Sequence, residues 1–392
     1  MKITADVRYV GVNDHSIDLF EGIYKVPNGM AYNSYVIMDE KVAILDTVDE
    51  EFTKEWLVKL EKELEGRKPD YLIVQHMEPD HSANIVHLLE RYPDTVLVAT
   101  GKAFDMMEHY FHTGLKAVRK VVADGETLSL GKHTLEFISA PMVHWPEVMV
   151  TYDETDKVLF SADGFGRFGA LDVEDAWETE ARRYYFGIVG KYGVQVNRLL
   201  QKLEGKEISY ICSLHGPVLK DKVAAYIQLY QKWASYEPEE EGIVIAYSSV
   251  YGNTQKAVMY LKEVLCKKGC EKVLLYDLAR SDMSVVVAQA FRYDRLVLAT
   301  TTYNGGLFPR MREFINHLTE REFQNRTIGF IENGSWAATA GKLMRDKFEK
   351  SKKIHFVEPF VKITSVMDEG NEKELALLAD ALCKQERNGR ER

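Results

Sequence analysis

The segment Gln75-His76-Met77-Glu78-Pro79-Asp80-His81-Ser82 carries the densest chemical signal in the chain. It follows the apolar run 71–74, which is typical of a buried strand, and it places four metal-ligating side chains within six positions. Pro79 interrupts a regular strand or helix, so we expect a loop at the end of the strand. Loops at strand ends direct side chains into a common pocket. The alternative is a charged surface loop; the pattern favours a metal site.

Three further candidate ligands each follow an apolar, strand-like run: His144 in Pro141-Met142-Val143-His144-Trp145-Pro146, Asp163 after Phe160, and His215 after Ile211. Taken singly, a histidine or aspartate at a strand end is usually a hydrogen-bonded structural residue. Taken together with the segment 75–82, they form an ordered set of ligand types that chance does not readily produce. The predicted metal ligands are therefore His76, Glu78, Asp80, His81, His144, Asp163 and His215.

The order of these residues resembles the metal signature of the metallo-β-lactamase fold, His-x-His-x-Asp-His followed by His, Asp and His. Glu78 stands where that family usually has its second histidine. A carboxylate makes the site harder and more anionic, which suits iron in both its ferrous and ferric states. This substitution resembles the flavodiiron proteins. The resemblance implies that His76, Glu78 and His144 hold one iron, that Asp80, His81 and His215 hold the other, and that Asp163 bridges them. His81 neighbours Asp80, so both side chains must turn toward the same metal.

The second half of the chain alternates between apolar strand-like runs and helical stretches. This alternation predicts a doubly wound parallel sheet covered by helices. We expect strands over 243–247, 273–278, 295–301, 326–331 and 353–359, and helices over 254–268, 282–291, 309–320, 340–350 and 371–386.

Glycine- and hydroxyl-rich segments follow the first, third and fourth of these strands. The first contains neither the lysine of a Walker loop nor the spacing of a dinucleotide fingerprint. It resembles the phosphate loop of flavodoxins, which bind FMN, although such loops also cap helices without a ligand. In a flavodoxin-like sheet these strand ends flank the ligand crevice. The predicted FMN contacts are Ser248, Ser249, Val250, Tyr251, Gly252, Asn253 and Thr254; Thr301, Thr302, Tyr303, Asn304, Gly305 and Gly306; and Asn333, Gly334, Ser335 and Trp336.

The first half of the chain has strands in pairs joined by turns, over 32–47 and 148–163, with a helix over 50–64. This indicates antiparallel-rich α/β layers. The acidic, proline- and glycine-containing segment 236–242 is typical of a linker. Both halves resemble a flavodiiron protein (A-type flavoprotein) over nearly the whole chain. The resemblance implies an α/β fold with a metallo-β-lactamase-like αββα diiron domain over 1–241 and a flavodoxin-like FMN-binding domain over 242–392.

The resemblance also implies the reaction and its partners. The family reduces O2 to water or NO to N2O at the diiron site, and FMN relays electrons from an external donor. It forms head-to-tail homodimers, or dimers of dimers, that bring the FMN of one subunit beside the irons of another. A rubredoxin extension needs two C-x-x-C pairs, which the four scattered cysteines do not supply. We therefore expect a separate rubredoxin-like protein or a reduced deazaflavin as donor. We expect O2 reduction to dominate, with Tyr24, Trp145 and Tyr185 as candidates for tuning the preference.

Composition narrows the alternatives. The 392 residues include 50 Lys and Arg against 60 Asp and Glu, and the net charge of −10 disfavours binding to nucleic acid. We expect no membrane span and no signal peptide, and few cysteines fit a reducing cytoplasm. Two other functions stay open. One is a dizinc hydrolase with an appended flavodoxin-like domain, and the other is an electron-transfer flavoprotein whose first half is a non-catalytic docking module.

Overall fold

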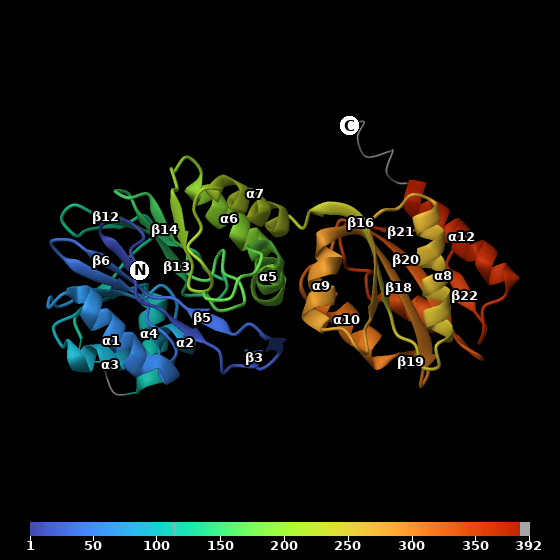
Figure 1. The fold of residues 1–392 in the computed structure, drawn as a ribbon, viewed down its shortest axis with the longest axis horizontal. Coiled ribbons are helices and arrows are strands. Elements are labelled where there is room, and N and C mark those ends of the chain that lie inside the picture. Colours follow the sequence, from blue (N-terminus) through green and yellow to red (C-terminus); the bar gives the residue numbers. More distant parts are fainter. Residues whose placement is uncertain (113–114, 116, 385–392) are drawn as a thin grey trace. The chain divides into compact units, whose positions relative to one another are not determined.

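The computed structural model describes residues 1–112, 115 and 117–384. The chain divides into two compact units, Met1–Ala234 and a second unit that begins at Ser235 (Figure 1). The domain boundary predicted between residues 241 and 242 stays a prediction. Part of the predicted linker is strand, however, because β16 (Glu240–Tyr247) begins at Glu240. Glu240 is not a solvated linker charge, since its carboxylate pairs with Lys272 and accepts a hydrogen bond from Arg292 Nε at 2.8 Å.

The first unit contains two mixed sheets, with predicted hairpins in both. The strand pair 32–47 contains the antiparallel strands β6 and β7, and the pair 148–163 contains β13 and β14. The first sheet has the order β1 (Val7–Tyr9), β6 (Tyr35–Met38), β7 (Val42–Leu45), β8 (Tyr71–Ile73), β9 (Val96–Ala99) and β10 (Arg119–Val121). The second has the order β11 (Thr127–Ser129), β12 (Thr134–Ser139), β13 (Met149–Asp153), β14 (Val158–Phe160) and β15 (Tyr210–Cys212).

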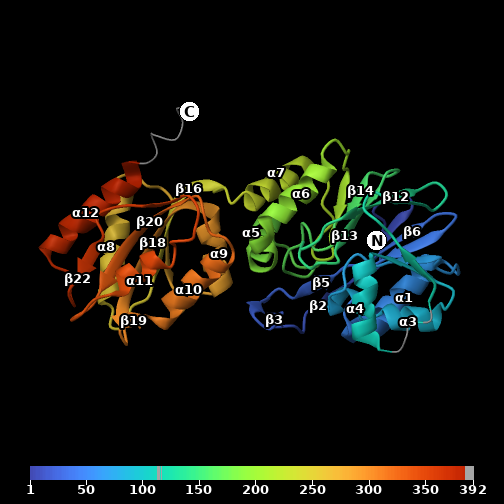
Figure 2. The same cartoon turned by 180° about the vertical axis from the view of Figure 1, so that it is seen from behind.

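Helices cover the outer face of each sheet, which confirms the expected αββα layering (Figures 1 and 2). In α1 the residues Trp56, Leu60 and Leu64 recur every fourth position and are fully or almost fully buried. All four residues of β7 are buried, because one face of this strand meets the helices and the other meets the second sheet. The covering helices are α1 (Thr53–Leu64), α3 (Ile85–Arg91) and α4 (Gly101–Phe111) on the first sheet, and α6 (Gly193–Leu203) and α7 (Val223–Ala234) on the second.

Short strands and helical segments complete the first unit. Two small antiparallel pairs are formed by β2 (Val12–Asp14) with β5 (Met30–Tyr32) and by β3 (Leu19–Phe20) with β4 (Tyr24–Lys25). The remaining helical segments are η1 (Glu50–Phe52), α2 (Pro79–Ser82), α5 (Trp177–Tyr184), η2 (Tyr185–Val189) and η3 (Gly190–Tyr192).

The second unit has the predicted doubly wound parallel sheet. Its strand order is β17 (Val273–Asp277), β16, β18 (Tyr293–Tyr303), β20 (Arg326–Asn333) and β21 (Ile354–Phe356). In chain order this is 2-1-3-4-5, the flavodoxin arrangement. A further strand, β22 (Val361–Ile363), also pairs in parallel with β20. The helices are α8 (Asn253–Lys267), α9 (Met283–Arg292), α10 (Pro309–Glu320), α11 (Ala340–Asp346) and α12 (Glu369–Lys384).

Several predicted boundaries were wrong. β18 runs to Tyr303 and β20 to Asn333, so Thr302, Tyr303 and Asn333 lie in strands and not in loops, whereas Thr301 lies within the strand predicted over 295–301. β18 continues because it pairs with β20 and then folds back onto β19 (Gly306–Leu307). The two turn residues between β18 and β19 both have positive φ, as a tight hairpin requires. The helix predicted over 340–350 ends at 346, and 385–386 of the last predicted helix lie outside the described residues.

Candidate metal centre and flavin site

Asp46, at the end of β7, fixes the loop that carries the first candidate ligands. Its carboxylate accepts hydrogen bonds from the backbone N–H groups of Gln75 and His76, at 2.8 and 3.2 Å, and from Gln75 Nε2 at 2.9 Å. Burial raises the pKa of Asp46 to about 6, although these hydrogen bonds oppose the shift. The loop after β8 is therefore held by a buried acceptor on the neighbouring strand.

The structure departs from the predicted loop at Pro79. Residues Pro79–Ser82 form the single helical turn α2, with Glu78 at its N-cap. Proline is tolerated at the first position of a helix, because a backbone N–H there would have no helical partner. The turn brings the neighbours Asp80 and His81 to the same point, with Asp80 Oδ2 and His81 Nε2 3.3 Å apart. Both side chains thus face one site, as a shared metal would require.

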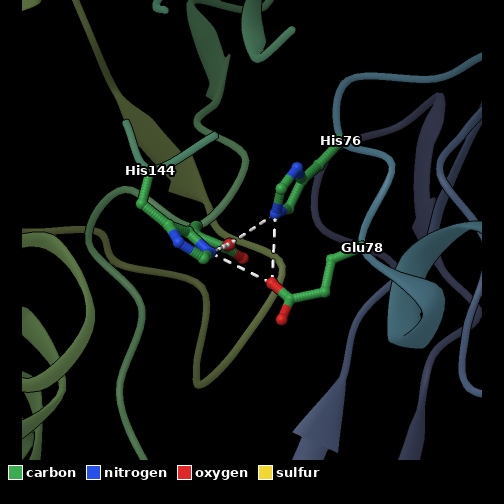
Figure 3. A group of neighbouring side chains, drawn as sticks. His76, Glu78 and His144 are labelled. Carbon is green, nitrogen blue, oxygen red and sulfur yellow. Dashed lines mark hydrogen bonds and ion pairs between the residues drawn. The ribbon is translucent and has the colours of Figure 1, made fainter. Parts of the chain in front are cut away.

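One group of candidate ligands consists of His76, Glu78, His144 and Asp163 (Figure 3). Glu78 Oε2 lies 3.2 Å from His76 Nε2 and 3.0 Å from His144 Nε2. Asp163 Oδ2 lies 3.2 and 3.1 Å from the same two nitrogens. His76 and Glu78 follow the first sheet, whereas His144 and Asp163 follow β12 and β14 of the second, so this group joins the two sheets.

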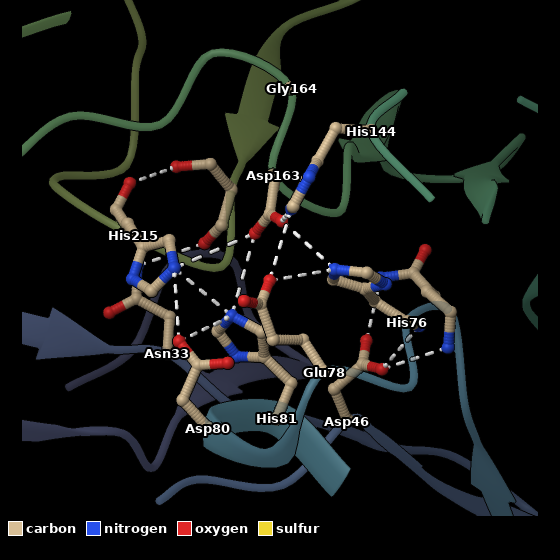
Figure 4. Close-up of polar contacts among 12 residues, drawn as sticks. Asn33, Asp46, His76, Glu78, Asp80, His81, His144, Asp163, Gly164 and His215 are labelled. Atoms are coloured by element: carbon tan, nitrogen blue, oxygen red, sulfur yellow. Dashed lines mark hydrogen bonds and ion pairs between the residues drawn. The ribbon is translucent and has the colours of Figure 1, made fainter. Parts of the chain in front are cut away.

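A second group consists of Asp80, His81 and His215, and it lies beside the other oxygen of Asp163 (Figure 4). The Nε2 atoms of His81 and His215 are 3.0 Å apart. Asp80 Oδ2 lies 3.3 Å from the former and 3.4 Å from the latter. Asp163 Oδ1 lies 3.4 Å from His81 Nε2 and 3.6 Å from His215 Nε2. The structure thus brings all seven predicted ligands together in two groups that share one carboxylate.

The chemistry of these groups fits two cations. Both carboxylate oxygens of Asp80 are buried and have no hydrogen-bond partner among the described residues, and the buried carboxylate of Asp163 faces imidazole nitrogens of both groups. His215 donates from Nδ1 to the carbonyl oxygen of Ala31 at 2.8 Å, which leaves a lone pair on Nε2 that faces Asp80. A lone pair directed at buried carboxylates is unfavourable unless a cation lies between them. Imidazole and carboxylate donors without a thiolate suit iron.

The crowding of these buried groups shifts their pKa values in both directions. Burial alone would lower the pKa of His144, but Asp163 and Glu78 raise it to about 9. Burial would raise the pKa of Glu78, but hydrogen bonds from His144 and His76 lower it well below its usual range. In the second group, burial and the charges of Glu78 and Asp163 raise the pKa of Asp80 to about 7. Burial and His81 lower the pKa of His215 to about 4.

Sequence reasoning missed the residues that orient the ligands. Asp46 and Glu147 are ordinary acidic residues, and only their contacts with the 75–77 loop reveal their role. The only sequence signal for Glu147 is its position three residues after His144. Among the proposed tuning residues, Trp145 lies beside the His76 ring, with ring centroids 5.2 Å apart. Tyr184, and not Tyr185, has its ring near His215, at 5.5 Å.

Tyr24 and Tyr185 lie in the aromatic packing of the first unit. The Tyr24 ring packs against Phe168, and its hydroxyl donates to the carbonyl oxygen of Gly187 at 2.8 Å. The Tyr185 ring packs against Tyr230 and Trp233, with ring centroids 5.0 and 5.3 Å away. Their predicted influence on the choice of gas stays a prediction.

The predicted FMN contacts lie at the carboxyl ends of β16, β18 and β20. The Oγ of Ser248 is buried without a hydrogen-bond partner among the described residues. Ser249 Oγ accepts from the backbone N–H groups of Gly252 and Gln255, which orders the loop before α8. Tyr251 is 92% exposed and Trp336 is 82% exposed. A buried hydroxyl with spare capacity and two solvent-exposed aromatic rings fit a phosphate and a planar flavin ring.

Several of the other predicted FMN contacts already form hydrogen bonds within the chain. Thr302 Oγ1 accepts from the backbone N–H groups of Thr339 and Ala340, at 2.9 and 3.1 Å, and so stabilises the start of α11. Thr301 Oγ1 donates to the carbonyl oxygen of Asn333 at 3.1 Å. Asn333 Nδ2 donates to the carbonyl oxygen of Ser365 at 3.2 Å, and Ser365 Oγ donates to Ser335 Oγ at 2.8 Å. These bonds join the ends of neighbouring strands, so backbone groups remain the main donors to a ligand. The assignment of individual flavin contacts stays a prediction.

Comparisons with known proteins agree with both halves of the fold. Residues 30–216 match the ODP family beta lactamase domain, and residues 244–360 match a flavodoxin domain. The flavodoxin match implies FMN as a cofactor. The anaerobic nitric oxide reductase flavorubredoxin of Salmonella paratyphi B is 30% identical over 349 residues, which cover 86% of this chain and 72% of that protein. In the described part of the chain, every helix is too short or too polar to cross a bilayer.

Solved structures give the same result. The rubredoxin oxygen:oxidoreductase of Desulfovibrio gigas superposes with a TM-score of 0.91 at 27% identity, covering 98% of both chains. The flavodiiron protein of Giardia intestinalis superposes with a TM-score of 0.85 at 25% identity, covering 98% of this chain and 97% of that one. Together with the two shared-carboxylate ligand groups and the flavodoxin-type sheet, these relationships show that the chain belongs to the flavodiiron protein family of oxidoreductases.

Proposed function

We propose that this chain reduces O2 to water, NO to N2O, or both, at two irons held by the seven candidate ligands. One observation carries the proposal: the two oxygens of Asp163 face two different ligand groups. Oδ2 lies 3.2 Å from His76 Nε2, and Oδ1 lies 3.4 Å from His81 Nε2. A single carboxylate between two nitrogen- and oxygen-rich groups is suited to bridging two metals. His76, Glu78 and His144 would hold one iron, and Asp80, His81 and His215 would hold the other.

The irons would supply reversible one-electron chemistry and open positions for a small gas. The chain supplies the surroundings. Asp46 and Glu147 hold the loop of His76, and Asn33 Nδ2 holds the loop of His215 through the carbonyl oxygens of Ser213 and Gly216, at 2.8 and 2.7 Å. His76, His81, Asp163 and His215 are completely buried, whereas the side chains of Glu78 and Asp80 are 14% and 11% exposed. Because both carboxylate oxygens of Asp80 are buried, the gas would approach on the side of Glu78.

The electron count explains why the family joins these two domains. Reduction of O2 to two waters takes four electrons and four protons, and coupling of two NO to N2O and water takes two of each. Two irons store two electrons and one flavin stores two more. We propose that FMN binds at the segment 248–254 and at the ends of β18 and β20, within a domain over 242–392, and that the diiron domain spans 1–241. The electrons would come from a rubredoxin-like protein or a reduced deazaflavin.

The same reasoning supports a homodimer or a dimer of dimers. The candidate metal ligands lie between residues 76 and 215, and the candidate flavin contacts lie between 248 and 336. A head-to-tail pair would place the FMN of one subunit beside the irons of its partner, and twofold symmetry would create two equivalent sites. Size-exclusion chromatography with light scattering at several concentrations measures this directly, and a strictly monomeric active enzyme would contradict it.

We propose that O2 reduction dominates over NO reduction. We also propose that the protein works in a reducing cytoplasm, which would keep its four cysteines as free thiols. The Desulfovibrio gigas neighbour, named as an oxygen:oxidoreductase, matches this chain over 98% of both lengths. The test is anaerobic stopped-flow turnover of each gas with the same reduced rubredoxin. Faster turnover of NO than of O2 would overturn the preference and leave the family unaffected.

Metal and flavin analysis of the purified protein tests the wider proposal. We expect two irons and one FMN per chain, with gas consumption that depends on both. The dizinc hydrolase alternative predicts zinc without iron, together with hydrolysis of a thioester or phosphoester. If the protein contains two irons but consumes neither O2 nor NO with a reduced donor, the proposed function is wrong.

A further inference from the structure

Glu147 contacts only one of the two ligand groups, through His76. It lies between β12 and β13, in the same loop as His144, and only 2% of it is exposed. Its Oε1 lies 2.8 Å from His76 Nδ1 and also accepts the backbone N–H of Met77 at 2.9 Å. Its own carbonyl oxygen accepts from Thr100 Oγ1 at 3.0 Å. Thr100 therefore holds the backbone of Glu147, and Oε1 of its carboxylate holds the first candidate ligand in place, whereas Oε2 is buried without a hydrogen-bond partner among the described residues.

The hydrogen bond determines which nitrogen of His76 is free for a metal. A carboxylate oxygen accepts, so Nδ1 carries the hydrogen, and Nε2 points to Glu78 and Asp163. The partner of a metal-bound histidine also tunes the metal, because a negatively charged acceptor makes the imidazole a stronger donor. His76 thus has an anionic partner on the side away from the metal position.

The histidines of the other group have weaker partners at Nδ1. His215 donates to the neutral carbonyl oxygen of Ala31 at 2.8 Å. The Nδ1 of His81 is buried and has no hydrogen-bond partner among residues 1–112, 115 and 117–384. Each group also has one terminal carboxylate and a share of Asp163, so the charge of Glu147 is an addition to one group only.

We infer that Glu147 makes the two metal positions electronically unequal and stabilises the more oxidised ion at the position of His76, Glu78 and His144. The inference rests on the proposed iron ligands. When one electron enters a pair of ferric ions, it reduces one of them to ferrous. With iron at both positions, the charge of Glu147 would favour the ferric ion beside His76 and would place an added electron at the position of Asp80, His81 and His215. It is a positioning residue, because it acts on the metal through His76.

Two substitutions in the holoenzyme separate charge from hydrogen bonding. Glu147→Gln retains an oxygen that can accept from His76 Nδ1 and removes the negative charge. Glu147→Ala removes the acceptor as well. The matched control is Glu207→Gln, an exposed glutamate on the segment before β15. For each protein we would measure iron per chain, the two one-electron midpoint potentials by anaerobic titration with dithionite, and the Mössbauer spectrum of the half-reduced state.

We expect Glu147→Gln to keep two irons, to move the second reduction step to higher potential, and to leave the first step in place. In the half-reduced state the ferric doublet should change and the ferrous doublet should not. Glu147→Ala should weaken binding of one iron by about 10–100-fold. The control should change none of these quantities.

Movement of the first step alone, or of neither step, in Glu147→Gln would overturn the inference. A chain that binds no iron would instead refute the proposed function. Two bound irons with normal gas consumption and unmoved potentials would refute only the role of Glu147.

Discussion

The Nε2 atoms of His81 and His215 face each other at 3.0 Å in the interior of the first unit. Neither ring can turn away easily, because His215 is held at Nδ1 by Ala31 and both side chains are fully buried. Two ring nitrogens at this distance either share a proton or bind a common cation. Burial and His81 lower the pKa of His215 to about 4, whereas Asp80 and Asp163 raise the pKa of His81 against the effect of burial, so without a metal His81 can donate its proton to His215. A cation would bind both nitrogens and also the buried carboxylates of Asp80 and Asp163, which one proton cannot do.

Removal of the metal should therefore destabilise the first unit. A ligand that binds only the folded state at one hundred times its dissociation constant contributes about 2.7 kcal/mol. For a unit of this size, chelation should lower Tm by roughly 5–10 °C. Differential scanning calorimetry before and after anaerobic treatment with an iron chelator measures the shift. The transition of the flavodoxin-type unit is the internal control and should stay in place. An unchanged transition of the first unit would contradict a metal at His81 and His215.

Substitution of Asp163 should affect both metal positions at once. Asp163→Ala removes the carboxylate whose two oxygens face the two groups, so we expect loss of both irons and a decrease of roughly 100-fold or more in O2 and NO consumption. Flavin content and reduction of the flavin by the donor should remain. Unchanged gas consumption would support the alternative of an electron-transfer flavoprotein with a non-catalytic first half. His144→Ala provides the comparison, because it should weaken mainly the position shared with His76 and Glu78.

Trp336 tests the flavin site. Its ring is 82% exposed, so Trp336→Ala should not disturb folding. If the ring stacks on the flavin, its loss removes about 1 kcal/mol, which corresponds to roughly a fivefold weaker affinity for FMN. Equilibrium titration of the flavin-free protein, followed by flavin fluorescence, measures the affinity. Leu377→Ala is a matched control, since Leu377 is 58% exposed on α12. Equal affinities in the two variants would exclude a contribution of the Trp336 ring.

His133 gives the stability of the first unit a pH dependence. It is fully buried, and its Nδ1 and Nε2 lie 2.8 and 3.2 Å from carboxylate oxygens of Asp153 and Asp6. Burial alone would lower the pKa of His133, but these carboxylates raise it to about 9. A raised pKa means that protonated His133 stabilises the fold fully below about pH 6.5 and loses this contribution as the pH rises through about 9.

His133→Gln should accordingly cost about 1.5–3 kcal/mol in urea unfolding near pH 6 and less near pH 9.5. The surface variant His15→Gln is the control, since His15 is half exposed and pairs with Asp172 near the surface. A cost for His133→Gln that is the same at both pH values would show that packing, and not the charged pair, is what His133 contributes.

Residue type and order made the seven candidate ligands predictable. Each follows an apolar run, and an apolar run followed by a ligand-type residue can be recognised in the sequence alone. The position of Pro79 misled the prediction, because proline ends a helix interior but suits its first turn. The extent of β18 also escaped the prediction, since Thr302 and Tyr303 are strand only because β19 pairs with them. Glu147 could not be identified at all, because its role depends on a contact with His76, 71 positions earlier.

Both ligand groups draw on the two sheets, and this has a consequence for how the protein matures. Residues from the first sheet cannot complete either group until the second sheet has docked against it, and His215 is among the last residues of the first unit to be synthesised. A nascent or partly folded chain therefore presents only fragments of the centre, with too few donors to retain iron. Iron uptake by this chain would mark the end of folding of the first unit, and cells would not load the metal into unfinished copies.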